Sequence, residues 1–371
     1  MRILHVITTV NRGGAENHLV DLCRGQVLAG HNVAVAYLKG DHYWRAEFER
    51  MGVRVEFLGL RRYGELAPVL RLCRVIHAFD PDVVHAHMPP AELYARLALV
   101  VFPGRRPAFV ISKHNDEPFF RGPGHELLGA WVAKRANAIV AISDAVNRYT
   151  RERRGTSTAV LKTVRYGIDP EPFQAVSREE AAAVRKSWHI PPDAWVIGTV
   201  ARLVPQKALH VLIEGYADYR ARATRSSRLV LVGRGPLEDE LKALAENFGV
   251  AGEIVWAGFR EDIPAVMRAF DLFALTSSYE GFGLVLLEAM SAARPVLATK
   301  VSAIPEIVRD NETGILCQAG NASSIAAALA KFESASMRAR MGDAGLQRVQ
   351  TLFTLARMNT ETESIYRMSI A

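Results

Sequence analysis

The chain of 371 residues lacks the cysteine patterns on which disulfide-rich domains and structural zinc sites are built. It has three cysteines, Cys23, Cys73 and Cys317, which are widely spaced, and it contains no CxxC pair or Cys/His cluster. We therefore expect neither a disulfide framework nor a zinc site. Isolated cysteines of this kind fit a reducing compartment.

Long hydrophobic runs are also missing. No stretch of 18 apolar residues occurs, so we expect no transmembrane helix. The first ten residues are apolar, but Arg12 and the Gly13-Gly14 pair follow at once without a cleavage-site pattern, which indicates a buried strand and not a signal peptide. The expected location is cytoplasmic, and a place at the inner face of the cytoplasmic membrane stays open.

Three common fingerprints are absent. Without G-x-G-x-x-G or G-x-x-x-x-G-K-[ST], neither NAD binding nor a P-loop is supported. His85, His87 and His114 end predicted strands, but there is no HExxH and no carboxylate at helical spacing, so we expect no metal. The D-x-D triplet at 80–82 is interpreted as a turn. His114 closes a buried strand at the edge where ligands bind, and it is a candidate site residue.

Both halves of the chain contain many basic and many acidic residues, but the balance between the two differs. Residues 1–170 hold 24 Lys+Arg and 16 Asp+Glu, and residues 171–371 hold 22 and 23. A basic half favours an anionic partner such as a membrane or a lipid phosphate, although solvated helix faces explain the same charges equally well. Aromatic residues are not interleaved with the basic ones, so no nucleic-acid partner is expected.

Apolar, β-branched segments alternate with helical patterns along the chain, which predicts parallel strands buried on both faces. The expected strands are 3–10, 32–38, 53–58, 82–88, 108–114 and 138–143, and then 195–202, 227–233, 253–259, 272–277, 294–299 and 313–318. Two doubly wound α/β domains facing across a cleft follow from this pattern. We place them at 1–170 and 171–351, joined by a linker at 166–180, with a terminal helix at 352–371 that returns to the first domain.

The segment 277–293 carries the clearest functional signal. Residues 277–283 are rich in turn formers, and 284–293 are apolar or small except for Glu288. This predicts a loop opening a buried helix, with Glu280 just before it and Glu288 two turns into it. A buried carboxylate needs a partner, and sugar or ribose hydroxyls and a phosphate at the helix N-terminus would fit. Alternatively, Glu288 pairs with a core cation and Glu280 lies on the surface.

Other candidates lie directly after predicted strands. Gly13-Gly14 and Gly233 permit close approach of the backbone to a phosphate, and Arg202 and Lys207 could reach a diphosphate. Each of these features is also compatible with an ordinary turn when it is taken alone.

The ordered set of these motifs resembles retaining glycosyltransferase family 4, which has the two-Rossmann GT-B fold. The resemblance covers essentially the whole chain and rests on the segments 13–16, His114, 166–169, Arg202 with Lys207, 233–236, 280–283 and Glu288. A glycine before Pro295 and a Gly-Gly pair at 302–303 are usual in that family. Here Arg294 and Ser302-Ala303 stand instead, which weakens any inference about the donor.

The resemblance implies a role for each candidate. Glu288 would hold the ribose, and Glu280 would hold the transferred sugar beside Phe282, Gly283 and the helix start at Leu284. The diphosphate would contact Arg202, Lys207 and the Gly13-Gly14 pair. His114 would lie at the donor sugar and the acceptor side. Gly233 and Arg260 would contact the base or a phosphate.

The function so implied is retaining, metal-independent transfer of a sugar from a nucleotide-diphosphate sugar, with UDP as the expected nucleotide. The acceptor would be a glycan or lipid-linked molecule in cell-surface polysaccharide, lipopolysaccharide or glycolipid assembly. No cofactor is expected beyond this co-substrate. The alternatives are a sugar-nucleotide epimerase or phosphorylase on the same fold and a non-catalytic sugar-nucleotide-binding protein.

Overall fold

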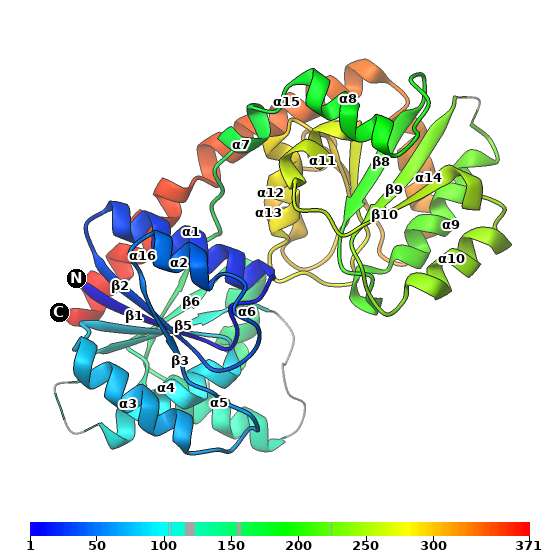
Figure 1. Cartoon of the computed structure of the whole chain (residues 1–371). Coiled ribbons are helices and arrows are strands. Elements are labelled where there is room, and N and C mark those ends of the chain that lie inside the picture. Colours follow the sequence, from blue (N-terminus) through cyan, green and yellow to red (C-terminus); the bar gives the residue numbers. More distant parts are fainter. Residues whose placement is uncertain (103, 105, 116–122, 154–156, 224) are drawn as a thin grey trace. The chain divides into compact units, whose positions relative to one another are not determined.

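The computed structural model describes residues 1–371 except 103, 105, 116–122, 154–156 and 224. The chain forms two compact units (Figure 1). The first contains Met1–Gly167 together with Thr354–Ala371, and the second contains Ile168–Phe353.

The first unit is built on a seven-stranded parallel sheet in the order β3-β2-β1-β4-β5-β6-β7. Its strands are β1 (Arg2–Ile7), β2 (Asn32–Tyr37), β3 (Arg54–Phe57), β4 (Val83–His87), β5 (Ala108–Lys113), β6 (Ala138–Ala141) and β7 (Val160–Thr163). Its helices are α1 (Gly14–Leu28), α2 (Arg45–Arg50), α3 (Ala67–Phe79), α4 (Pro89–Val101), α5 (Pro123–Arg135), α6 (Asp144–Arg153) and, from the end of the chain, α16 (Leu355–Ile370).

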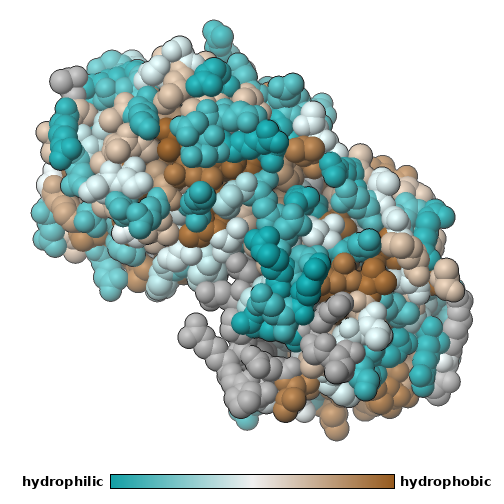
Figure 2. Space-filling model, turned by 180° about the vertical axis from the view of Figure 1, so that it is seen from behind, coloured by the Kyte–Doolittle hydropathy of each residue, from teal (hydrophilic) through white to brown (hydrophobic). Residues whose placement is uncertain are grey.

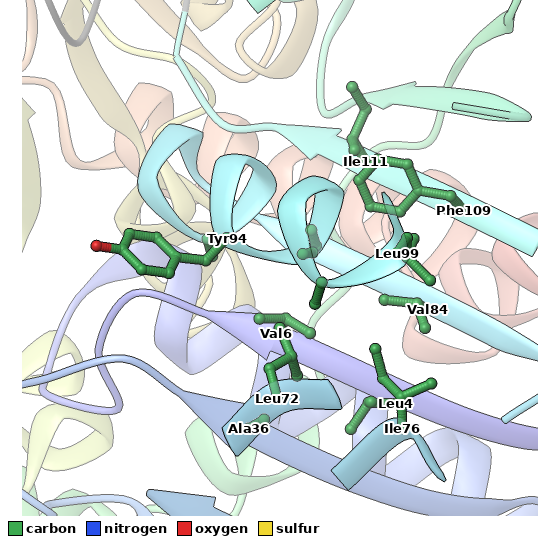
Figure 3. Close-up of a cluster of buried hydrophobic side chains, with 14 of the residues drawn as sticks. Leu4, Val6, Ala36, Leu72, Ile76, Val84, Tyr94, Leu99, Phe109 and Ile111 are labelled. Carbon is green, nitrogen blue, oxygen red and sulfur yellow. The ribbon is translucent and has the colours of Figure 1, made fainter. Parts of the chain in front are cut away.

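Helices cover both faces of this sheet, which is why the five strands between its two edge strands are buried along almost their whole length. In Figure 1, α3, α4 and α5 lie on one face and α1, α2 and α16 on the other. Figure 3 shows the core on the first face, where side chains of β1 and β4 such as Leu4 and Val84 meet Leu72 and Ile76 of α3 and Leu99 of α4. The opposite face packs against α1 and α16, so the last helix completes the core of the first unit.

The second unit repeats the scheme with a six-stranded parallel sheet in the order β10-β9-β8-β11-β12-β13. The strands are β8 (Trp195–Val200), β9 (Ser227–Val232), β10 (Ile254–Gly258), β11 (Leu272–Leu275), β12 (Val296–Thr299) and β13 (Gly314–Cys317). The helices are α7 (Glu171–Gln174), α8 (Arg178–Ser187), α9 (Leu209–Arg220), α10 (Glu238–Asn247), α11 (Ile263–Ala269), α12 (Leu284–Ser291), α13 (Ile304–Ile307), α14 (Ala322–Lys331) and α15 (Ala335–Leu352), with short 3-10 turns η1 (Pro205–Lys207) and η2 (Ala251–Glu253).

In both sheets the chain first winds outward in one direction and then continues on the other side of the first strand. The reversal lies between β1 and β4 in the first unit and between β8 and β11 in the second. The predicted fold class of two Rossmann-like, doubly wound α/β domains is confirmed. The expected cleft stays a prediction.

Two details differ from the predicted element pattern. The strand β7 was not predicted, because it lies at the sheet edge and alternates exposed with half-buried residues instead of forming an apolar run. The expected linker at 166–180 contains the short helix α7 and the first residues of α8. Prolines at 170 and 172 suggested an irregular segment, but a proline in the first turn is compatible with a helix.

Among the described residues, no helix combines the length and the hydrophobicity needed to cross a bilayer. On the face that Figure 2 shows, hydrophilic residues are interspersed with smaller hydrophobic areas.

The end of α12 carries backbone strain. The N–H of Ala293 donates to Met290 O at 2.9 Å and that of Arg294 to Ala289 O at 2.9 Å, which is a Schellman motif. The residue that turns the chain is Ala293, with a φ of 53° in the left-handed region. Glycine usually occupies such a position, because a Cβ atom is unfavourable there.

We predict that Ala293→Gly raises the free energy of unfolding by about 0.5–1 kcal/mol, since relief of the left-handed strain exceeds the added entropy of the unfolded chain. Ala292→Gly is the matched control: Ala292 has a φ of −80° and is buried, so its replacement should lower stability. Urea unfolding of both variants measures the difference. A loss of stability in Ala293→Gly similar to that of the control would contradict the strain argument.

Candidate functional site

Most of the predicted site residues lie in the second unit, at the carboxyl ends of four neighbouring strands. The loop after β8 holds Arg202 and Lys207, and the loop after β11 holds Glu280. The loops after β9 and β10 hold Gly233 and Arg260. Since the sheet order is β10-β9-β8-β11, these loops share one edge and flank the reversal between β8 and β11. Ligands of doubly wound folds bind at this point.

The two loops at the reversal are joined by an ion pair. Lys207 Nζ contacts Glu280 Oε1, and Ser277 Oγ donates to the same carboxylate oxygen at 2.7 Å. Glu280 is only 7% exposed, so its charge is largely removed from water and depends on these partners. The alternative interpretation of Glu280 as a surface residue is therefore wrong.

Residues that the sequence analysis did not single out fix this loop pair. Gln206 Nε2 donates to Tyr279 O at 3.0 Å, and the N–H of Ser278 donates to Gln206 O at 2.8 Å. Thr299 Oγ1 donates to Ser277 O at 2.6 Å from the neighbouring strand β12. These contacts hold the loop that carries Glu280 against η1, and no sequence motif predicted them.

The helix after this loop begins where it was predicted. Gly283 is the N-cap of α12, with a φ of 93° that favours glycine, and Leu284 is the first helical residue. The first N–H groups of any α-helix have no partner within the helix, so they can bind an anion. Phe282 is buried, and its ring packs edge-on to Phe353 with centroids 6.1 Å apart.

Glu288 is the fifth residue of α12 and is half-buried. The prediction placed it two turns into the helix, whereas the fifth residue of a helix that begins at Leu284 lies in the second turn.

Gly233 is required by the close approach of two loops. Its φ is 140°, and a Cβ atom at this position would lie 1.9 Å from Ala201 O. Its N–H donates to Gly258 O at 2.8 Å, so the loops after β8, β9 and β10 are packed backbone to backbone. Any larger residue would push the segment before Arg202 away from this edge.

Two of the predicted cations have different surroundings. Arg202 is exposed at the sheet edge. Arg260 forms a forked contact with Asp262, with Nε–Oδ1 and Nη2–Oδ2 distances of 2.8 and 2.5 Å. The carboxylate holds the pKa of Arg260 above its usual value, and Arg260 in turn lowers the pKa of Asp262. A nucleotide contact by Arg260 would have to compete with this pair, which sequence reasoning did not foresee.

The remaining predicted residues belong to the first unit. Gly13 has extended backbone and is the N-cap of α1, which begins at Gly14, directly after the loop that follows β1. Among the residues that the structure describes, nothing lies within 4 Å of a Cβ atom placed on Gly14, so they leave this face of the helix start open. Thr9 Oγ1 donates to Glu16 Oε1 at 2.6 Å and orders the first turn.

His114, just after β5, is the end of a buried hydrogen-bonded chain of side chains. Its Nδ1 lies 2.5 Å from Tyr166 Oη, and its Nε2 lies 3.3 Å from His87 Nδ1. The chain continues from His87 Nε2 to His5 Nδ1 at 3.0 Å and from His5 Nε2 to Gln26 Oε1 at 2.8 Å. Both nitrogens of His114 are therefore engaged inside the first unit.

A second branch connects this chain to the last helix. Gln26 Nε2 donates to Tyr366 Oη at 3.3 Å, and Tyr366 Oη lies 2.7 Å from His85 Nδ1. His85 Nε2 lies 2.7 Å from Ser112 Oγ. The helix that returns from the end of the chain thus contributes a polar group to the centre of the first unit.

The Gln26 amide sets the direction of every bond in the chain. Its oxygen accepts from His5 Nε2–H, so His5 Nδ1 accepts from His87, His87 Nδ1 accepts from His114, and His114 Nδ1 accepts from the Tyr166 hydroxyl. Each imidazole is then neutral, with one donor and one acceptor. Burial lowers the pKa of His5 to about 4 and, with help from Lys113, that of His114 to about 3. Burial also holds low the pKa values of His18, His85 and His87.

Three of these imidazoles are close enough to share a metal ion. Ring nitrogens of His5, His85 and His87 lie within 4.8 Å of one another. Every ring nitrogen of the three already has a hydrogen-bond partner, so a metal would have to replace those bonds. Only His85 and His87 were considered from the sequence. The parallel pairing of β1 with β4, which places His5 opposite His85, is the signal that could have added His5.

Comparison with known proteins matches two family models to the chain. The model described as Glycosyltransferase Family 4 matches residues 12–172, and the model described as Glycosyl transferases group 1 matches residues 180–348. The Rhizobium meliloti (strain 1021) protein named lipopolysaccharide core biosynthesis glycosyltransferase LpsE is 28% identical over 341 residues, covering 90% of this chain and 89% of that protein.

Two further similarities show how varied the relatives are. The N-acetyl-alpha-D-glucosaminyl L-malate synthase of Bacillus anthracis is 24% identical over 306 residues, covering 81% of this chain and 78% of its own. The crystal structure of Anabaena Alr3699/HepE in complex with UDP and glucose has a TM-score of 0.86 at 24% identity and covers 98% of both chains.

We predict that the first unit loses stability as the pH falls from about 6.5 towards 4. The unfolded chain binds protons on histidine near pH 6.5, while the folded unit keeps these imidazoles neutral, so each histidine can cost up to about 1.4 kcal/mol per pH unit in this window. Urea unfolding at pH 7.5, 6 and 5 measures the slope. His5→Asn should flatten it, and the exposed His210→Asn should not. Equal slopes in both variants would contradict the prediction.

Proposed function

The chain belongs to the glycosyl transferases of group 1 and family 4, and we propose that it transfers a sugar, with retention of anomeric configuration, from a nucleotide-diphosphate sugar to a glycan or lipid-linked acceptor. The single observation that carries this proposal is the ion pair of Lys207 and Glu280 at the reversal of the second sheet, beside the start of α12.

This arrangement offers what a sugar diphosphate needs. Glu280 Oε1 already accepts from two donors, and the carboxylate has further lone pairs that sugar hydroxyls can use. The N–H groups at the start of α12 suit a phosphate. Glu288 lies on the same helix, and its proposed partner is the ribose of the nucleotide.

The chemistry follows from the charges that develop during transfer. Cleavage of the sugar–phosphate bond places negative charge on the leaving diphosphate, and fixed cations and N–H dipoles stabilise it. Lys207 and the exposed Arg202 are the proposed cations, and Arg202 is free to move towards a phosphate because it lies at the surface. No metal is required in this scheme.

Retention requires the acceptor to attack the face from which the diphosphate leaves. A covalent intermediate would need a carboxylate nucleophile near the anomeric carbon. Glu280 is engaged with Lys207 and Ser277, and we propose that it positions the sugar while the departing phosphate accepts the proton of the acceptor hydroxyl.

The expected nucleotide is UDP. This is supported by the similar Anabaena protein, which was crystallised in complex with UDP and glucose. A base contact by Arg260 would require its guanidinium to leave Asp262 or to bind both groups, because Asp262 already holds it.

The acceptor is proposed to belong to cell-surface polysaccharide, lipopolysaccharide or glycolipid assembly at the cytoplasmic side of the membrane. The name of the Rhizobium meliloti relative supports this class, and the basic balance of residues 1–170 suits an anionic membrane. Binding to liposomes with anionic lipids at low salt, lost at high salt, is the expected behaviour. No sedimentation at low salt would remove the membrane contact from the proposal.

We predict that UDP or a UDP-sugar raises the melting temperature, because a ligand that binds only the folded state stabilises it by mass action. A thermal-shift panel of UDP, GDP, ADP and their sugar conjugates, with and without EDTA, measures this. A shift for one nucleotide that EDTA leaves unchanged is expected. If no nucleotide shifts the melting temperature, the proposed nucleotide site is wrong. A shift that EDTA abolishes would contradict metal independence.

We predict that Glu280→Ala keeps the thermal shift with the free nucleotide. Its turnover, measured separately as sugar transfer, should fall by about 10²-fold or more, because the reacting sugar is no longer positioned. Glu312→Gln, an exposed carboxylate paired with Arg309, is the control and should retain activity. Wild-type turnover in Glu280→Ala would refute the site. Conversion of the sugar nucleotide without an acceptor would indicate an epimerase.

A further inference from the structure

Arginines gather near a single carboxylate at the amino ends of the strands of the second sheet. The carboxylate belongs to Asp271, which directly precedes β11. The arginines come from α8, α11, the turn after α12 and α15, and they are Arg185, Arg268, Arg294 and Arg338. All four are half-buried. Because partly buried like charges are costly without compensation, the partners of these guanidinium groups decide whether the cluster is complete.

Asp271 is already engaged. Its Oδ1 lies 2.9 Å from Arg185 Nη2, and its Oδ2 accepts from the N–H of Val196 at 2.8 Å. Arg185 is further held by its Nε, which donates to Ala269 O at 2.7 Å. The carboxylate therefore serves one arginine and the backbone of β8, and it does not pair directly with the other three arginines.

Two of the other arginines meet at one backbone oxygen. Arg268 Nη1 donates to Ala292 O at 3.2 Å, and Arg294 Nε donates to the same oxygen at 3.1 Å. Ala292 is the C-cap of α12, and the carboxyl end of a helix carries only about half of an elementary negative charge. Among the described residues, the two guanidinium groups have no other hydrogen bond or ion pair, so N–H groups of both remain available to a ligand.

The electrostatics of the cluster show the same excess of positive charge. Burial and the neighbouring Arg268 lower the pKa of Arg294 to about 10, and Asp271 acts in the opposite direction. The guanidinium carbon of Arg338 lies 5.4 Å from the ring centre of Trp195, the first residue of β8. Burial and neighbouring arginines lower the pKa of Arg338 as well, again against Asp271. An anion between these side chains would remove the repulsion.

This excess depends on Arg294, which stands where a glycine is usual in the resembled family. With glycine there, the last oxygen of α12 would face one guanidinium group instead of two. Arg268 alone satisfies that oxygen, so capping of the helix does not require Arg294. The added charge has a physical reason if the two guanidinium groups bind a ligand together.

We propose that this cluster binds a phosphate group, with Arg268 and Arg294 as the contacts and Arg185 and Arg338 as neighbours that strengthen the positive potential. The planar guanidinium fork matches phosphate oxygens, and two adjacent forks suit a dianion. The cluster lies at the amino ends of the strands, whereas the proposed nucleotide site lies at their carboxyl ends. It is therefore a second anion site, and it does not depend on the proposed sugar transfer.

The test is calorimetric titration of the full-length protein with inorganic phosphate and with glycerol 3-phosphate, at constant ionic strength in chloride. Arg294→Gln should weaken binding by about tenfold or more, because charge-assisted hydrogen bonds are lost. Arg309→Gln is the matched control in the same unit, since Arg309 is exposed and paired with Glu312, and it should bind as the wild type does. The tighter of the two probes identifies the free ion or an organic ester as the ligand.

Arg202→Gln separates this site from the nucleotide site, because Arg202 is exposed at the other edge of the sheet. Binding that Arg202→Gln abolishes and Arg294→Gln retains would overturn the proposal, and so would absence of binding in the wild type.

Urea unfolding in chloride and in phosphate distinguishes a ligand contact from a merely structural role. A ligand of the folded state stabilises it, so phosphate should raise the urea midpoint of the wild type more than that of Arg294→Gln. If Arg294 only caps α12, the two proteins differ by the same amount in both salts, and this result would also overturn the proposal.

Discussion

The arrangement of both units depends on the direction of their strands. All strands of each sheet are parallel, so every connection crosses a face of the sheet and every strand ends at the same edge. Where the winding reverses, two loops diverge and leave room between them. In the second unit those loops hold Lys207 and Glu280. In the first unit the loop after β1 leads to the Gly13-Gly14 turn, and β4 ends at His87. The candidate chemistry of the molecule is concentrated at these reversals.

The two units keep buried polar groups in opposite ways. In the second unit, Lys207 and Glu280 form an ion pair that offsets the cost of burying each charge. The pair lies at the point where a sugar diphosphate is proposed to bind. In the first unit, the imidazoles around His5 and His87 stay neutral, and one amide, that of Gln26, directs their hydrogen bonds. A charged pair can open to a charged ligand, whereas a neutral network that satisfies every nitrogen resists rearrangement.

The positions at which the sequence departs from the resembled family lie at or next to strained backbone. Ala293 and Ser302 both have positive φ, at 53° and 45°, and Ser302 stands at the first position of the usual Gly-Gly pair. Next to Ala293, Arg294 is mostly buried, and its surroundings lower its pKa to about 10 through burial and the nearby Arg268. These positions follow β12 and α12, so the departures alter the second unit close to the helix that carries Glu288.

By itself, the sequence determined the two doubly wound sheets, twelve of their strands and the loop that opens α12, because burial on both faces forces continuous apolar runs that are visible without a structure. It did not reveal β7, whose edge position needs no such run, or the contact of Arg260 with Asp262. Tertiary structure alone decided that Lys207 pairs with Glu280 and that His5 and Tyr366 join the chain of His114. These residues are far apart in the chain, and only the parallel register and the returning last helix bring them together.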